Sequence, residues 1–251
     1  MRALGALVLL LASAGAAAAE TLVTSVSTPR VVIQSNFSGA DIVIFGGIGQ
    51  DGPLATHGRY DIVVTVRGPA GPLSVREKER RAGIWINSDR RRYKDVPSFL
   101  ALASSRPIGE ITSPEMIRQY GLSLDTAMDP AGAGTRSAET RRFRDALIRL
   151  KAGSGLFIER PKGVIFLNDE LFRATVPLPA NVPLGIYQVE TRLLIDGVVV
   201  TGQRASLEVI KSGFENQVAE WATERAGLYG VATCLIALAL GWLATVVFRR
   251  D

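Results

Sequence analysis

Short apolar runs alternate with turn residues along most of the chain between residues 20 and 211. The runs are rich in β-branched and aromatic residues, and Gly, Pro, Asn or Asp interrupts them at short intervals. This pattern is typical of antiparallel strands joined by turns, so we predict a mainly β domain. The runs that carry this prediction are 31–34, 41–45, 60–66, 83–87, 156–159, 164–167, 172–176, 187–195 and 198–210.

Seven or more short strands with turn residues between them favour a β-sandwich over a barrel, and local signals near its C-terminal end add detail. Asp196-Gly197 separates the last two apolar runs, and a type I′ hairpin turn needs positive φ at both of its central residues. The segment 183–187, Pro-Leu-Gly-Ile-Tyr, precedes that hairpin and resembles the turn that leads into a late strand of immunoglobulin-like domains. The expected fold is therefore an immunoglobulin-like sandwich.

Residues 112–154 break the strand pattern and predict a helical insertion. Ser113-Pro114-Glu115 has the composition of a helix start, and Ser137 is expected to cap a second helix. In that helix Phe143, Leu147 and Leu150 fall on one face, while Arg141, Arg142, Arg144, Arg149 and Lys151 are expected to face solvent. The insertion would be a cap on one end of the sandwich, or alternatively a lid or partner-binding flap.

Both ends of the chain carry membrane-targeting patterns. Residues 1–19 have a charged start, an apolar run and small residues ending in Ala17-Ala18-Ala19, as in a secretory signal peptide. Residues 226–248 contain no charged side chain and are long enough to cross a bilayer. We expect an exported domain at 20–211, a juxtamembrane helical stalk at 212–225, a transmembrane helix at 226–248 and a cytoplasmic tail at 249–251.

The orientation follows from these two ends. Cleavage of the signal leaves the mature N-terminus outside, and Arg249-Arg250 on the short tail agrees with a cytoplasmic C-terminus. The expected location is the bacterial inner membrane, with the main domain in the periplasm.

Composition narrows the chemistry of the exported part. The net charge is +5, and an extracytoplasmic domain with this mild excess is not expected to bind nucleic acid. Cys234, the single cysteine, lies in the predicted span, and His57 is the single histidine, which excludes the usual zinc ligand sets. A serine triad would have to use His57, and the G-x-G-x-x-G at 47–52 is not followed by a helix. We therefore predict a non-enzymatic protein without cofactor, metal or catalytic residues.

The most charged stretch lies at 76–95, which holds eight basic residues. We expect strand, turn, strand: a core strand at Ile84-Trp85-Ile86, and a turn at 87–89. In one interpretation the exposed cations protect an edge strand from pairing with other chains. In the other, they bind lipid headgroups, a small anion or an acidic protein face. The candidate contacts are Arg90, Arg91, Arg92 and Lys94.

Small residues recur along the predicted span and form a candidate packing face. Small residues allow close helix approach within a membrane, although they are also frequent in ordinary spans. The residues of this face are Gly230, Cys234, Ala237, Gly241 and Thr245.

Segments spread over nearly the whole chain resemble a family of uncharacterised proteobacterial transmembrane proteins. The resemblance lies in 37–46, 83–87, 96–100, 105–107, 185–187 and the single C-terminal span. It implies topology and supplies no catalytic residues. Members of that family are encoded near transporters similar to sulfite or sulfonate exporters, which implies a transport-accessory role.

Two functional hypotheses follow. The first is an accessory or assembly subunit of a membrane complex, plausibly a transporter, with an integral membrane protein as partner. The alternative is a periplasmic binding module that takes a small anion or a lipid headgroup through the basic cluster.

Overall fold

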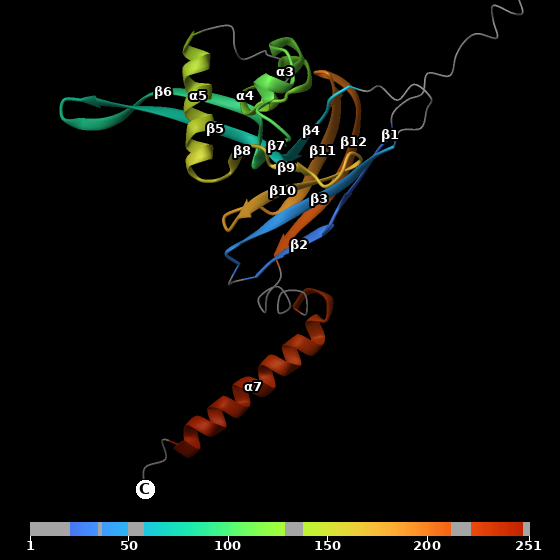
Figure 1. The fold of residues 1–251 in the computed structure, drawn as a ribbon. Coiled ribbons are helices and arrows are strands. Elements are labelled where there is room, and N and C mark those ends of the chain that lie inside the picture. Colours follow the sequence, from blue (N-terminus) through green and yellow to red (C-terminus); the bar gives the residue numbers. More distant parts are fainter. Residues whose placement is uncertain (1–20, 35–36, 50–57, 129–137, 212–221, 248–251) are drawn as a thin grey trace, which may run out of the picture.

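The protein is mainly β, with one long apolar helix at its C-terminal end (Figure 1). The structure is a computed structural model that describes residues 21–34, 37–49, 58–128, 138–211 and 222–247. The expected signal peptide and most of the expected stalk lie outside these residues. Each run predicted as a strand lies largely within one, and the strand at 60–66 matches β4 (Tyr60–Arg67) almost residue for residue.

Two sheets share the main apolar core. A four-stranded antiparallel sheet has the order β1 (Thr21–Val26), β3 (Gly39–Gly49), β10 (Leu171–Pro179) and β9 (Val164–Phe166). A six-stranded, strongly curved sheet has the order β2 (Arg30–Ile33), β12 (Val198–Lys211), β11 (Gly185–Ile195), β4, β7 (Leu100–Ser104) and β8 (Phe157–Pro161) (Figure 1). The inward positions of both sheets fill the core, including Ile44, Phe172, Ile62 and Tyr187.

The turn predicted between β11 and β12 is confirmed. Asp196 and Gly197 have φ values of 47° and 85°, so the β11–β12 hairpin turn has the two positive φ angles that were predicted. Tyr187 is fully buried, and its hydroxyl donates a hydrogen bond to the Pro183 carbonyl over 2.6 Å. This bond ties the start of β11 to the chain that enters it.

Helices cover the outer face of the six-stranded sheet instead of one end of the domain. The segment holds α2 (Ile108–Ile111), α3 (Pro114–Tyr120), α4 (Leu124–Met128) and α5 (Ala138–Gly153). Outward residues of the sheet, such as Val63 on β4 and Leu102 on β7, pack against them. The expected end cap was wrong in position, because the inner face is already filled by the other sheet and the apolar outer face needs cover.

The predictions for the caps and the buried faces of the helical segment were partly correct. The Ser113 side chain accepts a hydrogen bond from Met116 N over 3.4 Å, and Gly121 ends α3 with a φ of 63°. On α5, Phe143 and Leu147 are buried as predicted, but Leu150 is 65% exposed. Arg144 was predicted to face solvent and is instead buried, where its guanidinium donates to Asp125 of α4. Ser137 lies outside the described residues.

Candidate functional site

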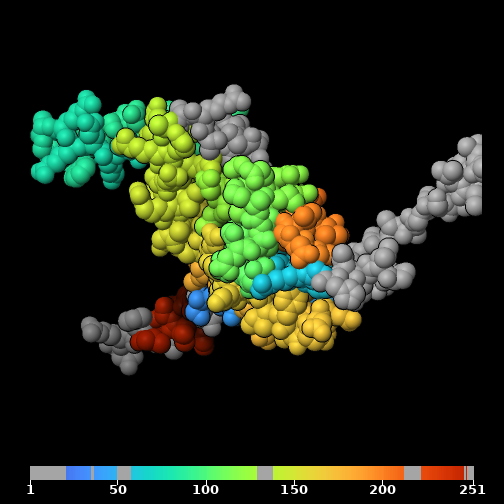
Figure 2. All heavy atoms as spheres, turned by 45° about the horizontal axis from the view of Figure 1, so that its top comes forward, coloured from blue at the N-terminus to red at the C-terminus, as the bar shows by residue number. Residues whose placement is uncertain are grey.

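A long β-hairpin projects from the body and carries most of the chain's excess charge. It consists of β5 (Ala70–Arg81) and β6 (Ile84–Pro97), which pair only with each other. We call residues 70–97 the arm. It contains eight basic and four acidic residues, a net charge of +4 against +5 for the whole chain. Figure 2 shows its outer end standing clear of the body.

The root of the arm is held in place by apolar packing against α5. Val75 and Val96 are buried in a cluster with Phe143 and Leu147, and Leu73 and Tyr93 pack against the same cluster. Beyond this cluster, Glu77 forms an ion pair with Arg142 of α5. These contacts involve only one side of the hairpin, so the opposite side is left to solvent.

The cross-strand register sorts the cations between the two sides. Arg76 pairs with Arg90, Arg80 pairs with Trp85, and a register shift between Arg76 and Lys78 places one extra residue on β6. Side chains alternate along each strand, and residues directly opposite share a side. Along β5, Val75 and Glu77 are covered while Arg76 and Lys78 are exposed. The side away from α5 carries Arg76, Lys78, Arg80, Arg90 and Arg92, which we call the basic face.

The four cations predicted as one cluster therefore do not all lie on one side of the arm. Arg90 and Arg92 lie on the basic face, but Arg91 is opposite Val75 and lies on the side of α5. Lys94 lies at a second register shift, between Gly71 and Leu73, where no paired residue fixes its side. The structure adds Arg76, Lys78 and Arg80 from the facing strand, which the sequence analysis did not include. The alternation of basic and acidic residues at 76–81 was the signal for them, because period-two alternation places like charges on one side of a strand.

The tip of the arm differs from the sequence prediction. Ala82 and Gly83 form the turn, with φ values of 50° and 84°, and the predicted turn at 87–89 is the irregular part of a continuous strand. The predicted core strand is exposed: Ile84 is 64% and Trp85 is 67% exposed. The hairpin reaches beyond the body at this point, so its apolar tip has no core to enter.

A groove of about 730 Å³ lies between the arm and α5. Arg141, Arg142 and Arg149 of α5 line it together with Glu77 and Asp145. These groups give a mixed, mainly basic lining. Among the described residues, no three His, Cys, Asp or Glu side chains gather in a way that could hold a metal ion. His57 lies outside the described residues.

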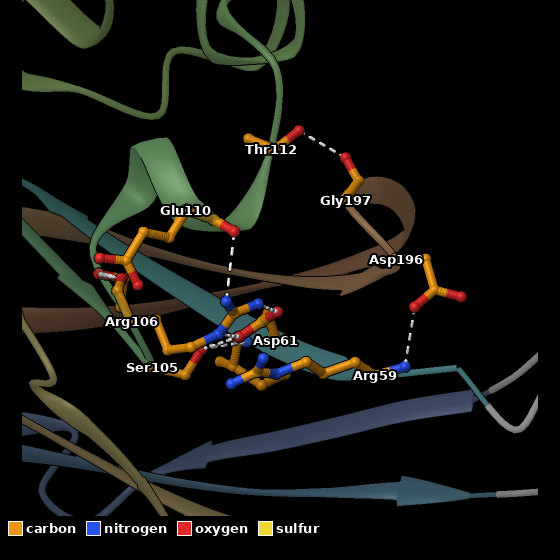
Figure 3. A network of polar contacts seen from close by, with 10 residues as sticks. Arg59, Asp61, Ser105, Arg106, Glu110, Thr112, Asp196 and Gly197 are labelled. Atoms are coloured by element: carbon orange, nitrogen blue, oxygen red, sulfur yellow. Dashed lines mark hydrogen bonds and ion pairs between the residues drawn. The ribbon is translucent and has the colours of Figure 1, made fainter.

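A buried ion pair is the other polar cluster of note (Figure 3). The Arg106 guanidinium forms an ion pair with the Asp61 carboxylate, whose side chain is 3% exposed, and Ser105 Oγ donates to the same carboxylate over 2.6 Å. The hydrogen bond to Asp61 raises the pKa of Arg106 above its ordinary value. Arg106 also donates to the Glu110 carbonyl over 3.2 Å. The cluster ties β4 to α2, and its donors and acceptors are used within the fold.

The C-terminal helix α7 (Ala226–Val247) is long and apolar enough to cross a membrane. No part of its apolar window is buried inside the described protein. Thr245 Oγ1 donates to the Gly241 carbonyl over 2.9 Å, so this side chain folds back on its own helix. Gly230, Cys234, Ala237, Gly241 and Thr245 fall within one narrow arc of the helix, given 100° of rotation per residue.

A mainly β domain and one helix that is long and apolar enough to cross a membrane place the chain in the class of membrane-associated proteins. The family described as "Putative transmembrane protein (Alph_Pro_TM)" matches residues 21–250, and the chain belongs to it. The predicted resemblance is thereby confirmed. No curated protein matches the chain.

Solved structures give only distant similarities. The sporulation control protein Spo0M from Bacillus subtilis is 11% identical, with a TM-score of 0.28, covering 83% of this chain and 56% of that protein. BslA, a bacterial hydrophobin, is 10% identical, with a TM-score of 0.24, covering 78% of this chain and 96% of that protein.

Proposed function

We propose that the protein is a single-span envelope protein that acts as an accessory or assembly subunit of a membrane complex such as a transporter. In this proposal α7 crosses the bacterial inner membrane, the β domain lies in the periplasm and the C-terminus is cytoplasmic. We infer that the two-sheet body is an immunoglobulin-like sandwich, which the buried Tyr187 hydrogen bond to Pro183 supports.

One observation carries the accessory role. The small-residue face of α7 is free of the described domain, because no part of the apolar window is buried against it. A membrane helix gains no hydrophobic drive from association, so small residues on one face favour close packing with another helix. The partner that fits this face is an integral membrane protein.

Substitutions on opposite sides of α7 test this role. Gly230→Leu with Gly241→Leu adds bulk to the small-residue face, and Ala232→Leu with Ala239→Leu adds similar bulk on the opposite face. The full-length tagged protein is purified in mild detergent, and co-purifying proteins are identified by mass spectrometry. We expect a stoichiometric multi-span partner that is lost with the glycine pair and kept with the alanine pair. A protein that is recovered alone, or equal recovery with both pairs, contradicts the proposal.

The second candidate is a binding module for a small anion. The exposed cations on the arm favour it, but a small anion needs donors that converge, and Arg91 lies on the other side from Arg90 and Arg92. Calorimetry of the full-length protein with sulfate would detect such a site through binding that Arg90→Ala and Arg92→Ala remove. A binding heat that is the same in the wild-type protein and in both variants would eliminate this candidate function.

A further inference from the structure

The cations of the basic face have no ion-pair partner within the described part of the chain. Ion pairs elsewhere join, for example, Glu79 to Arg81 and Glu77 to Arg142, both on the other side of the arm. Arg76 even lies directly opposite Arg90, an arrangement of like charges that weakens a hairpin. Five cations lie in a row on one side of two strands, and only Arg76 among them also lines the groove beside α5. A row of cations spread along two strands suits an extended anionic surface more than one compact ligand.

The apolar tip continues this surface. Trp85 pairs with Arg80 and shares its side, so the tryptophan ends the row of cations. Tryptophan combines an apolar ring with a polar N–H and is enriched where membranes meet water. Ile84 is exposed beside it on the turn. An arginine row ending in an exposed Trp-Ile tip matches the layered chemistry of a bilayer surface, with phosphates outside and acyl chains beneath.

The root of the arm lies at the end of the six-stranded sheet from which the chain continues to α7. Pro69 connects β4 to the arm, and a side chain at Gly185 would begin 3.0 Å from its Cγ. Gly185 pairs with Val209, two residues before the end of β12 at Lys211. Ten residues separate Lys211 from the described start of the C-terminal segment.

From these observations we propose that the basic face of the arm binds the anionic phospholipid headgroups of the membrane that α7 crosses, with Trp85 at the level of the headgroups. The inference rests on one part of the proposed function, namely that α7 anchors the protein in the membrane. Anchoring keeps the arm at a high effective concentration near the bilayer, so weak contacts suffice. Each cation near an anionic surface contributes about fivefold in affinity. The contact would fix the orientation of the domain above the membrane.

Fluorescence of a single tryptophan tests this contact in the full-length protein. Trp221→Phe and Trp242→Phe leave Trp85 as the reporter, and the protein is placed in lipid nanodiscs with brominated acyl chains. Discs of phosphatidylcholine are compared with discs that also contain phosphatidylglycerol. We expect quenching of Trp85 only in the anionic discs, and we expect added salt to abolish it because the exposed charges are screened. The salt titration needs no further variant, so it is independent of folding defects.

Charge removal on each side of the arm supplies the matched comparison. Arg76→Gln with Arg90→Gln and Arg92→Gln should abolish the quenching, whereas Arg91→Gln on the other side should keep it. No quenching in anionic discs overturns the proposal, as does equal quenching in both lipids. Relief of the quenching by inorganic phosphate, at an ionic strength at which sodium chloride has no effect, would also overturn the proposal. That result would assign the face to a free anion. Co-purification through α7 is a separate measurement. A negative quenching result therefore contradicts the lipid contact alone, and a negative co-purification result contradicts the accessory role alone.

Discussion

Arg76 and Arg90 lie directly opposite each other on the arm, and both side chains are exposed. Like charges in this position destabilise a hairpin by a few tenths of a kcal/mol, and water screens exposed groups further. Arg90→Glu should therefore raise the free energy of unfolding slightly at low salt, and the gain should shrink at high salt. Urea unfolding measures it. Arg91→Glu, opposite Val75, is the control and should give no such gain; an equal gain from both variants would contradict the pairing.

The exposed tip predicts that two large apolar side chains add little to stability. Trp85→Ala and Ile84→Ala should each change the free energy of unfolding by less than about 0.5 kcal/mol, since neither side chain is packed in a core. Phe143→Ala on α5 removes a ring that is 5% exposed and should cost about 3–5 kcal/mol. Thermal or urea unfolding of the three variants compares them directly. A loss of several kcal/mol at Trp85 would mean that the tip is buried.

The buried ion pair predicts an asymmetry between its two partners. Arg106→Ala leaves the Asp61 carboxylate, 3% exposed, without its countercharge and should cost about 3–5 kcal/mol. Asp61→Asn should cost less, because the Arg106 side chain is 21% exposed and can reach water. Urea unfolding of both variants tests the order. Equal losses, or a larger loss in the asparagine variant, would show that the carboxylate is better solvated than its burial indicates.

Tyr187 predicts a stability loss at alkaline pH. Burial of the phenol raises its pKa to about 12, mainly by desolvation, while the unfolded chain has a value near 10. The folded state holds the proton more tightly, so this contribution is complete below about pH 10 and declines as the pH rises towards 12. Unfolding as a function of pH measures the slope. Tyr187→Phe should flatten it and, by removing the hydroxyl bond to Pro183, should cost about 1–2 kcal/mol at neutral pH. An unchanged slope in the phenylalanine variant would assign the alkaline loss to other groups.

Much of the body could be predicted from the sequence because local rules operate there. The β11–β12 turn and the cap at Ser113 each depend on a few adjacent residues, and both formed as expected. The inner strands β4 and β7 are buried along nearly their whole length, and β4 coincides with one of the apolar runs that predicted the strands. The C-terminal helix, which is long and apolar enough to cross a membrane, could likewise be predicted from composition and length.

The arm could not be predicted in this way because its environment is set by distant parts of the fold. Ile84-Trp85 is as apolar as a core strand, and only the length of the hairpin relative to the body carries it beyond the core. Arg91 lies on the opposite side of the arm from Arg90 and Arg92. This arrangement depends on the pairing register and on which side of the arm α5 covers. Arg144 is buried for a similar reason, because Asp125 of α4 lies beside it.

In the proposed topology α7 anchors the protein in the membrane, and the domain and its arm lie outside the cytoplasm. Cysteine labelling tests it directly: Cys234→Ser removes the native thiol, and Asn87→Cys places a new one on the exposed arm. Spheroplasts are treated with a membrane-impermeant maleimide, and a second variant carries its cysteine after Asp251. The account predicts labelling at position 87 in intact spheroplasts, with the C-terminal cysteine labelled only after lysis. The reverse pattern would contradict it.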